Sequence, residues 1–151
     1  MTLRERGFYF NGSNVWSTEE DELILNHTGV LAMWIRPLDL SVDSVLYERS
    51  NRIAKIDLTS LVVRFTWNGT TIEAEHGITI GEWSPWVNIA AIWQHRSELS
   101  MKINDVVAAQ LEWTDDTLDT PESDTLVGTN YVGMINHFSI YNFIPTSFTT
   151  D

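Results

Sequence analysis

The segment LVVRFTWNGTT (residues 61–71) constrains the fold more than any other part of the chain. Apolar side chains occupy every second position from Leu61 to Trp67, and this period of two is that of a β-strand with one buried face. Asn68-Gly69 follows at once, and it is the strongest short hairpin signal because both central turn residues need positive φ. The sequence therefore predicts a β-hairpin here, with Leu61 and Trp67 on the buried side.

Other segments repeat this pattern. LSMKIND (99–105) alternates and ends in the turn-forming pair Asn104-Asp105, and HFSIYNFI (137–144) alternates again. The best helical candidate, TEEDELIL (18–25), is short and acidic. Many short strands separated by turn signals predict an all-β fold, either a two-sheet antiparallel sandwich or a barrel.

Two segments, GVLAMWIRP (29–37) and WVNIAAIW (86–93), are apolar at nearly every position. Strands that are covered on both faces have this composition, so we expect both faces of these two segments to be buried. Pro37 is expected to end the first of them, because proline cannot donate a hydrogen bond to a neighbouring strand.

Charge and composition narrow the function. Of the 151 residues, 9 are Lys or Arg and 21 are Asp or Glu, so the net charge is −12. Such a surface repels phosphate, which argues against nucleic acid and anionic membranes as partners. No apolar run approaches the roughly 20 residues that cross a bilayer, so membrane insertion is not expected. With no cysteine there is no disulfide. We expect residues 1–151 to form a single domain of a longer protein; a small protein complete as given is the alternative.

Four segments resemble, in chain order, the strands of laminin-G-like domains in the concanavalin A-like lectin/glucanase superfamily. They are FYFNGSNVW (8–16), GVLAMWIRP (29–37), WVNIAAIWQHRSELSMKINDVV (86–107) and VGTNYVGMINHFSIYN (127–142). The resemblance implies an all-β jelly roll, in which about twelve to fourteen antiparallel strands form two curved, facing sheets. It does not imply one activity, because function depends on the site.

The chain departs from the family at several positions. Asn11, Asn136 and His137 stand where the family commonly has acidic residues, and Asn88 replaces the usual histidine. Members of the family often bind calcium through loop carboxylates, so these departures weaken the expectation that calcium binding is inherited.

No catalytic pattern is present. Glycoside hydrolysis needs two carboxylates flanking the scissile bond. The resemblance implies that hydrolases of the superfamily carry an E-x-D-x-E-like array on one strand, and neither EEDE (19–22) nor ESD (122–124) has that spacing. The four histidines show no metal-ligand spacing. The sequence therefore predicts that the protein is not an enzyme.

The acidic segment WTDDTLDTPESDT (113–125) is the best cation candidate. It is predicted to be a surface loop, and Asp115, Asp116 and Asp119 could supply oxygen ligands to calcium. A solvated loop that binds no metal is the alternative.

Seven tryptophans raise the question of sugar stacking. Trp34, Trp67, Trp86 and Trp93 fall within strand patterns and are expected in the core. Trp83 and Trp113 lie at strand ends or in loops, and they are the candidates for ligand binding, with a purely structural role as the alternative.

Three N-x-S/T sequences, starting at Asn11, Asn26 and Asn68, are candidate glycosylation sites. Each falls in a predicted turn or loop, although turns favour Asn-Gly for backbone reasons. Just before the first of these sequences, Phe8 and Phe10 share a face of the predicted strand and are expected in the core.

Together these observations favour a non-catalytic binding or adhesion module. It would act outside the cell or on its surface, as part of a larger protein, and recognise a glycan or a protein through loops at the rim of the sandwich. The competing hypothesis is a structural domain that has retained no ligand site. Glycan hydrolysis through Glu20 and Glu22 is a third and weaker one.

Overall fold

The computed structural model describes residues 8–18, 28–49, 54–81, 85–94, 97–113 and 125–141. Within these ranges the chain forms twelve strands and no helix. The strands make two six-stranded sheets, which we call sheet A and sheet B, and every pairing between neighbouring strands is antiparallel. The expected all-β sandwich is therefore confirmed.

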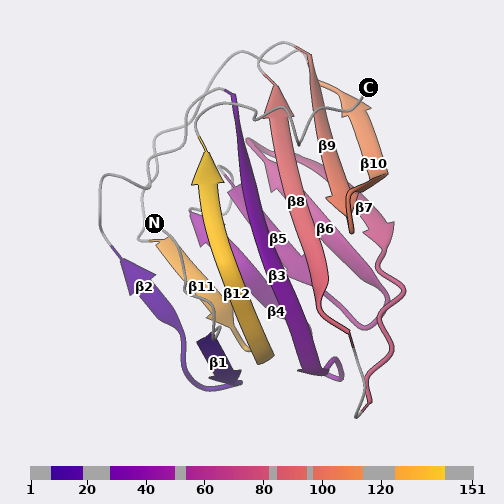
Figure 1. Ribbon diagram of the computed structural model, residues 1–151. Helices are drawn as coiled ribbons and strands as arrows, with labels where there is room; N and C mark the ends of the chain where they lie inside the picture. The colour runs from indigo at the N-terminus through magenta and orange to yellow at the C-terminus, as the bar shows by residue number, and fades with distance from the viewer. Residues whose placement is uncertain are drawn as a thin grey trace.

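Sheet A crosses the front of the view in Figure 1, and sheet B lies behind it. In spatial order, sheet A consists of β1 (Phe8–Asn11), β12 (Val132–Tyr141), β3 (Gly29–Asp39), β8 (Val87–Gln94), β9 (Glu98–Ile103) and β10 (Val106–Glu112). In spatial order, sheet B consists of β2 (Trp16–Thr18), β11 (Thr125–Thr129), β4 (Ser44–Arg49), β5 (Ala54–Leu58), β6 (Val62–Trp67) and β7 (Thr70–Glu75).

Both predicted hairpin turns are present. Asn68 and Gly69 have φ of 47° and 89° and join β6 to β7, with Trp67 opposite Thr70. Asn104 and Asp105, at 52° and 66°, join β9 to β10 in the same way. Positive φ at both central residues gives the turn a twist that matches that of the strands.

The expectation that Leu61 lies on the buried side is wrong. The strand begins one residue later, at Val62, and Leu61 is 58% exposed in the turn before it. Its backbone carbonyl accepts a hydrogen bond from the His76 N–H, so the residue is held by its main chain while its side chain faces water.

Strands β3 and β8 lie side by side in the middle of sheet A. As predicted, β8 is buried on both faces, but β3 is buried on both faces only from Gly29 to Met33. Pro37 does not end β3, which continues to Asp39. The pairing with β8 stops at Ile35, so Pro37 is flanked only by β12. There Gly133 pairs with Pro37 and Val132 with Asp39, which leaves Leu38 bulged. A proline is tolerated beside such a bulge because the ladder is already interrupted.

Aromatic rings fill the space between the sheets. Trp67 of sheet B and Trp93 of sheet A stack with centroids 4.4 Å apart and planes 15° apart, and both are fully buried as expected. Burial of each ring stabilises the fold by about 5 kcal/mol before conformational entropy is counted. Phe65 lies beside both rings. This cluster packs β6 of sheet B against β8 of sheet A.

At the β1 end of the sandwich, Phe10 is fully buried, whereas Phe8 is only partly covered and contacts the Phe10 ring. The expectation of two core phenylalanines is therefore correct for Phe10 alone, because β1 is an edge strand. Across the core, the Phe10 ring lies against the backbone of Gly128 in β11. Gly128 has φ of 85°, which a residue with a side chain rarely adopts.

Candidate binding face

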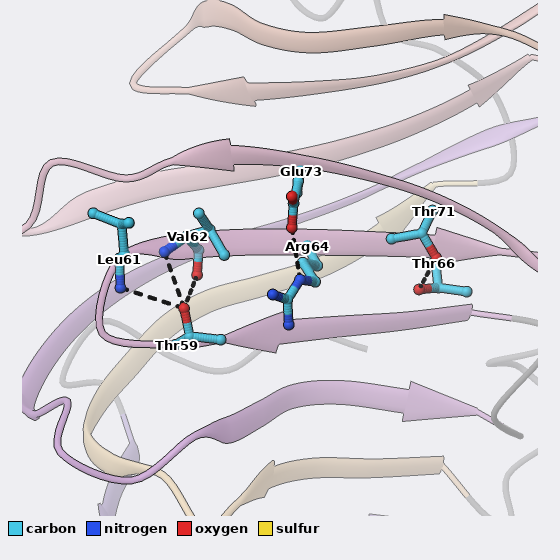
Figure 2. Close-up of polar contacts among 7 residues, drawn as sticks. All are labelled: Thr59, Leu61, Val62, Arg64, Thr66, Thr71 and Glu73. Carbon is cyan, nitrogen blue, oxygen red and sulfur yellow. Dashed lines mark hydrogen bonds and ion pairs between the residues drawn. The ribbon is translucent and has the colours of Figure 1, made fainter.

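The outer face of sheet B is an ordinary solvated surface. Figure 2 shows Arg64 on β6 directed toward Glu73 on β7, with Nε and Oε2 2.7 Å apart. Nearby, the hydroxyls of Thr66 and Thr71 are 2.9 Å apart. Charged and hydroxyl side chains on this face therefore satisfy one another, and this pattern does not indicate a ligand.

The outer face of sheet A has a different chemistry. Along β3, Met33 and Ile35 point into the core, and the alternation of a strand turns Trp34 and Arg36 to the outside. Trp34 is 37% exposed, although it lies in one of the most apolar segments of the chain. The expectation that Trp34 is a core residue is therefore wrong.

Cross-strand pairing gathers further side chains around Trp34. Asn136 of β12 lies opposite Trp34 on one side and Asn88 of β8 lies opposite it on the other. Directly opposed residues of antiparallel strands share a face, with Cβ atoms about 5 Å apart. One row further along, Arg36 pairs with Met134, and Met134 pairs with Tyr9 of β1.

We call this surface the Trp34 face. It comprises six residues from four strands: Tyr9, Trp34, Arg36, Asn88, Met134 and Asn136. Two exposed rings, two amides, a thioether and a guanidinium thus share one side of the sheet, although the Asn88 amide is only 9% exposed. Arg36 is the one charged residue among these six, in a chain with a net charge of −12.

Backbone and amide contacts hold the Trp34 face in place. The Asn88 side chain donates from Nδ2 to the Met33 carbonyl at 3.4 Å. The Asn88 N–H donates to Asn104 Oδ1 at 2.9 Å, and the Asn104 N–H donates back to the Asn88 carbonyl at 2.9 Å. The β9–β10 turn is thereby fixed against β8, directly beside the strand that carries Trp34.

A buried tyrosine supports the sheet under the same strands. The Tyr131 hydroxyl donates to the Met134 carbonyl at 2.9 Å, and burial raises the pKa of Tyr131 above its usual value. Gly133 lies above this hydroxyl, and a Cβ there would come within 2.7 Å of it. The glycine lets β12 lie close to β3 at this position.

On the central strands β3 and β8, the exposed positions of the outer face stop at Trp34. Beyond it, toward the start of β3, the outward residues of the central strands are buried and form a second apolar cluster: Val30, Ala32, Ala90 and Ile92, with Tyr141 partly buried against them. The Trp34 face is therefore confined to the half of the sheet that carries the end of β3.

Trp113, one of the two predicted ligand-binding residues, does not lie on the surface. It is 3% exposed and packs edge-on against Trp67, with centroids 6.1 Å apart and planes at 89°. The prediction that its ring meets a ligand is therefore wrong, because the end of β10 closes over the core. Trp83, the other candidate, lies outside the described residues.

The predicted calcium ligands Asp115, Asp116 and Asp119 also lie outside the described residues. Within the part of the chain that the structure describes, no group of three or more His, Asp or Glu side chains could hold a metal ion. Nor does that part contain a helix that is long and apolar enough to cross a membrane.

Of the three candidate glycosylation sites, Asn26 is not described. Asn11 is exposed, and its Oδ1 accepts hydrogen bonds from the N–H groups of Ser13 and Asn14. Asn68 is only 5% exposed in its hairpin turn. Glycosylation at these positions stays a prediction.

The sequence carried one signal for the Trp34 face. In a strand formed by GVLAMWIRP, Trp34 and Arg36 point to one face, and Met33 and Ile35 point to the other. Arginine rarely faces a core, so Arg36 marks its side of β3 as the exposed side and Trp34 belongs to that side. The continuous apolar run obscured this alternation.

Solved structures of known proteins have the same arrangement of strands. The Ruminococcus gnavus IT-sialidase CBM40 bound to alpha2,3 sialyllactose superposes with a TM-score of 0.77 at 10% identity, over 97% of this chain and 94% of that one. Domains LG4-5 of the mouse laminin alpha1 chain give a TM-score of 0.68 at 12% identity, over 89% of this chain and 40% of that one. The binding domain of botulinum neurotoxin serotype D gives 0.68 at 11% identity, over 91% and 40% of the two chains.

The sequence itself matches no protein-family model and no curated protein. At identities of 10–12% the structural likeness establishes the fold alone. The chain therefore has the jelly-roll sandwich that these lectin-like and laminin-G-like domains share, as the resemblance of its four segments predicts.

Proposed function

We propose that this domain is a non-catalytic binding module that recognises a glycan through the Trp34 face. The observation that carries the proposal is the exposure of Trp34 on a central strand, with Arg36 beside it and Asn136 opposite it. An indole ring offers a flat apolar surface, amides donate and accept hydrogen bonds, and a guanidinium pairs with carboxylates. This is the combination that a sugar requires.

Sialylated glycans are the first ligands to test. The R. gnavus module was solved with sialyllactose, and the binding domain of botulinum neurotoxin DC was solved in complex with SialylT. Arg36 could pair with the carboxylate of such a sugar, and no residue of the Trp34 face would repel it. A module of this kind would act outside the cell or on its surface.

A protein ligand is the second candidate. Tryptophan, tyrosine, methionine and arginine are enriched at protein interfaces, and the Trp34 face contains one of each. The two candidates differ in the area that they need, because a specific protein interface buries about 800 Å² on each partner. Under the glycan proposal, substitutions more than about two strands away from Trp34 should therefore leave binding unchanged.

The glycan proposal can be tested by calorimetric titration of the purified domain with α2,3-sialyllactose and with lactose, after a screen on a glycan array. We expect sialyllactose to bind and W34A to abolish the binding. Val42 is a matched control, because it is an apolar residue that is 62% exposed in the turn after β3, outside the Trp34 face, so V42A should bind as the wild type does. R36M should weaken sialyllactose more than any neutral glycan found by the array.

Binding that persists in W34A but is lost in W83A would move the site to the rim of the sandwich and contradict the proposal. The absence of binding to every glycan would also contradict it. Titrations with added calcium and with EDTA test whether Asp115, Asp116 and Asp119 contribute. Chromatography of the glycans after incubation tests the non-catalytic part, since any cleavage product would refute it.

A further inference from the structure

The two exposed rings of the Trp34 face lie on different strands. Trp34 is in β3, and Tyr9 is in β1, where it is 55% exposed. Strand β12 lies between β1 and β3 in sheet A, as Figure 1 shows. Tyr9 is opposite Met134, which in turn is opposite Arg36. Because Arg36 is two residues further along β3 than Trp34, the two rings are diagonal neighbours across β12.

The spacing of the two rings follows from the geometry of a sheet. Neighbouring strands lie about 4.8 Å apart, so β1 and β3 are separated by about 10 Å, and two residues along a strand span about 7 Å. The Cα atoms of Tyr9 and Trp34 are therefore roughly 12 Å apart. One sugar ring is smaller than an indole and cannot cover both side chains, and two directly linked sugar rings lie closer together than this. A glycan that stacks on both rings therefore needs at least one unit between the stacked ones.

The turn after β1 holds Tyr9 in place, although β1 is an edge strand. Asn14 Nδ2 donates a hydrogen bond to the Tyr9 carbonyl at 3.1 Å, and the Asn11 N–H donates to Asn14 Oδ1 at 2.7 Å. On its other side Tyr9 pairs in register with Met134 of β12. The distance between the two rings is thereby set by the protein, so binding should depend on the length of the ligand.

The side chains between the two rings belong to β12. Met134 and Asn136 occupy outward positions there, and both are half-buried. Asn136 Oδ1 accepts a hydrogen bond from the His137 N–H at 2.9 Å, which holds the amide in one orientation. A ligand that crosses β12 would meet a thioether and an amide, with the guanidinium of Arg36 beside its path. These groups can pack against a sugar unit and form hydrogen bonds with its hydroxyl or carboxylate groups.

We propose that the ligand of the Trp34 face is an oligosaccharide of at least three units, which crosses β12 and stacks one unit on Trp34 and another on Tyr9. This inference rests on the proposed function and adds the length and direction of the ligand. Tyr9 is then a specificity-determining residue, because it adds affinity only for glycans that are long enough to reach it. Loss of its aromatic contact should weaken such a glycan about threefold to tenfold.

The experiment compares a short and a long glycan that share their terminal unit. The methyl α-glycoside of N-acetylneuraminic acid has one unit and is titrated by ligand-observed NMR, and α2,3-sialyllactose has three and is titrated by calorimetry. We expect Y9A to weaken sialyllactose about threefold to tenfold and to leave the one-unit glycoside unchanged. W34A should weaken both. Y9F retains the ring and V42A lies outside the Trp34 face, so both controls should bind as the wild type does.

If the glycan array identifies a neutral glycan instead, its one-unit and three-unit forms replace these two probes. Binding that depends on Trp34 but is unchanged in Y9A for both lengths would overturn this inference and leave the proposed function standing. An equal loss for both lengths in Y9A would also overturn it, because Tyr9 would then contact the same unit as Trp34. If no glycan of either length binds the wild type, the proposed function fails, and this inference fails with it.

Discussion

Replacing Gly128 with alanine should destabilise the sandwich strongly, because two separate costs meet at this residue. Gly128 has φ of 85°, and a Cβ there would overlap three atoms of the Phe10 ring, the farthest of them at 2.8 Å. Phe10 is fully buried between the sheets and cannot swing into solvent without leaving a cavity. The side chain of alanine therefore has to displace either the ring or the backbone of β11.

The two costs can be estimated separately. A left-handed backbone conformation costs an L-residue about 1–2 kcal/mol. Inserting a methyl group into a filled core costs about 1–3 kcal/mol. Together they give a loss of about 2–5 kcal/mol in the free energy of unfolding, and a mid-range loss of about 3 kcal/mol corresponds to a fall of roughly 6–12 °C in melting temperature for a chain of this length.

Gly77 provides the control that separates these costs. It has φ of 66°, and a Cβ there would meet nothing within 4 Å, so G77A carries the backbone cost alone. Urea unfolding followed by tryptophan fluorescence should place G128A about 1–3 kcal/mol below G77A. The double variant F10L/G128A should lose less than the sum of its single variants, since leucine frees part of the space. Equal losses in G128A and G77A would refute the packing argument.

Two further predictions concern polar groups. His76 Nδ1 accepts a hydrogen bond from the Ile78 N–H, and its Nε2 donates one to the Thr59 carbonyl. H76A removes both bonds and should lower the free energy of unfolding, measured in urea, by about 1–3 kcal/mol. A loss below about 0.5 kcal/mol would contradict this prediction. Burial raises the folded-state pKa of Tyr47 and Tyr131, so the folded state retains these protons more tightly than the unfolded chain does. The contribution of these two tyrosines to stability is complete below about pH 10 and is lost as the pH rises above it. Absorbance at 295 nm should therefore show both tyrosines ionising only as the protein unfolds. Ionisation of either one in the folded protein would contradict this prediction.

Much of the fold could be predicted from local sequence because the relevant constraints are local. Asn68-Gly69 and Asn104-Asp105 specify tight turns through their own backbone preferences, and both form as expected. Pro37 was misjudged for a non-local reason. Its effect depends on which strands flank it, and only the register with β12 shows that the ladder is already interrupted there.

The proposed site was harder to predict, because it depends on pairing between distant segments. Tyr9, Trp34, Asn88 and Asn136 are far apart in the chain, and only the order of strands in sheet A brings them to one surface. Trp113 illustrates the opposite error. Its predicted place at a strand end or in a loop suggested a free ring, yet the end of β10 lies over the Trp67–Trp93 stack.

The position of Trp34 has a kinetic consequence. Strand β3 is hydrogen-bonded to β12 on one side and to β8 on the other at this residue, so the backbone under the indole is held before any ligand arrives. A ring on a flexible loop would need its backbone as well as its side chain to be ordered on binding, and a ring on a central strand avoids the backbone part of that cost. Under the proposed function, encounter with such a surface needs no slow rearrangement of the backbone, so ligands of different affinity should differ mainly in how long they remain bound.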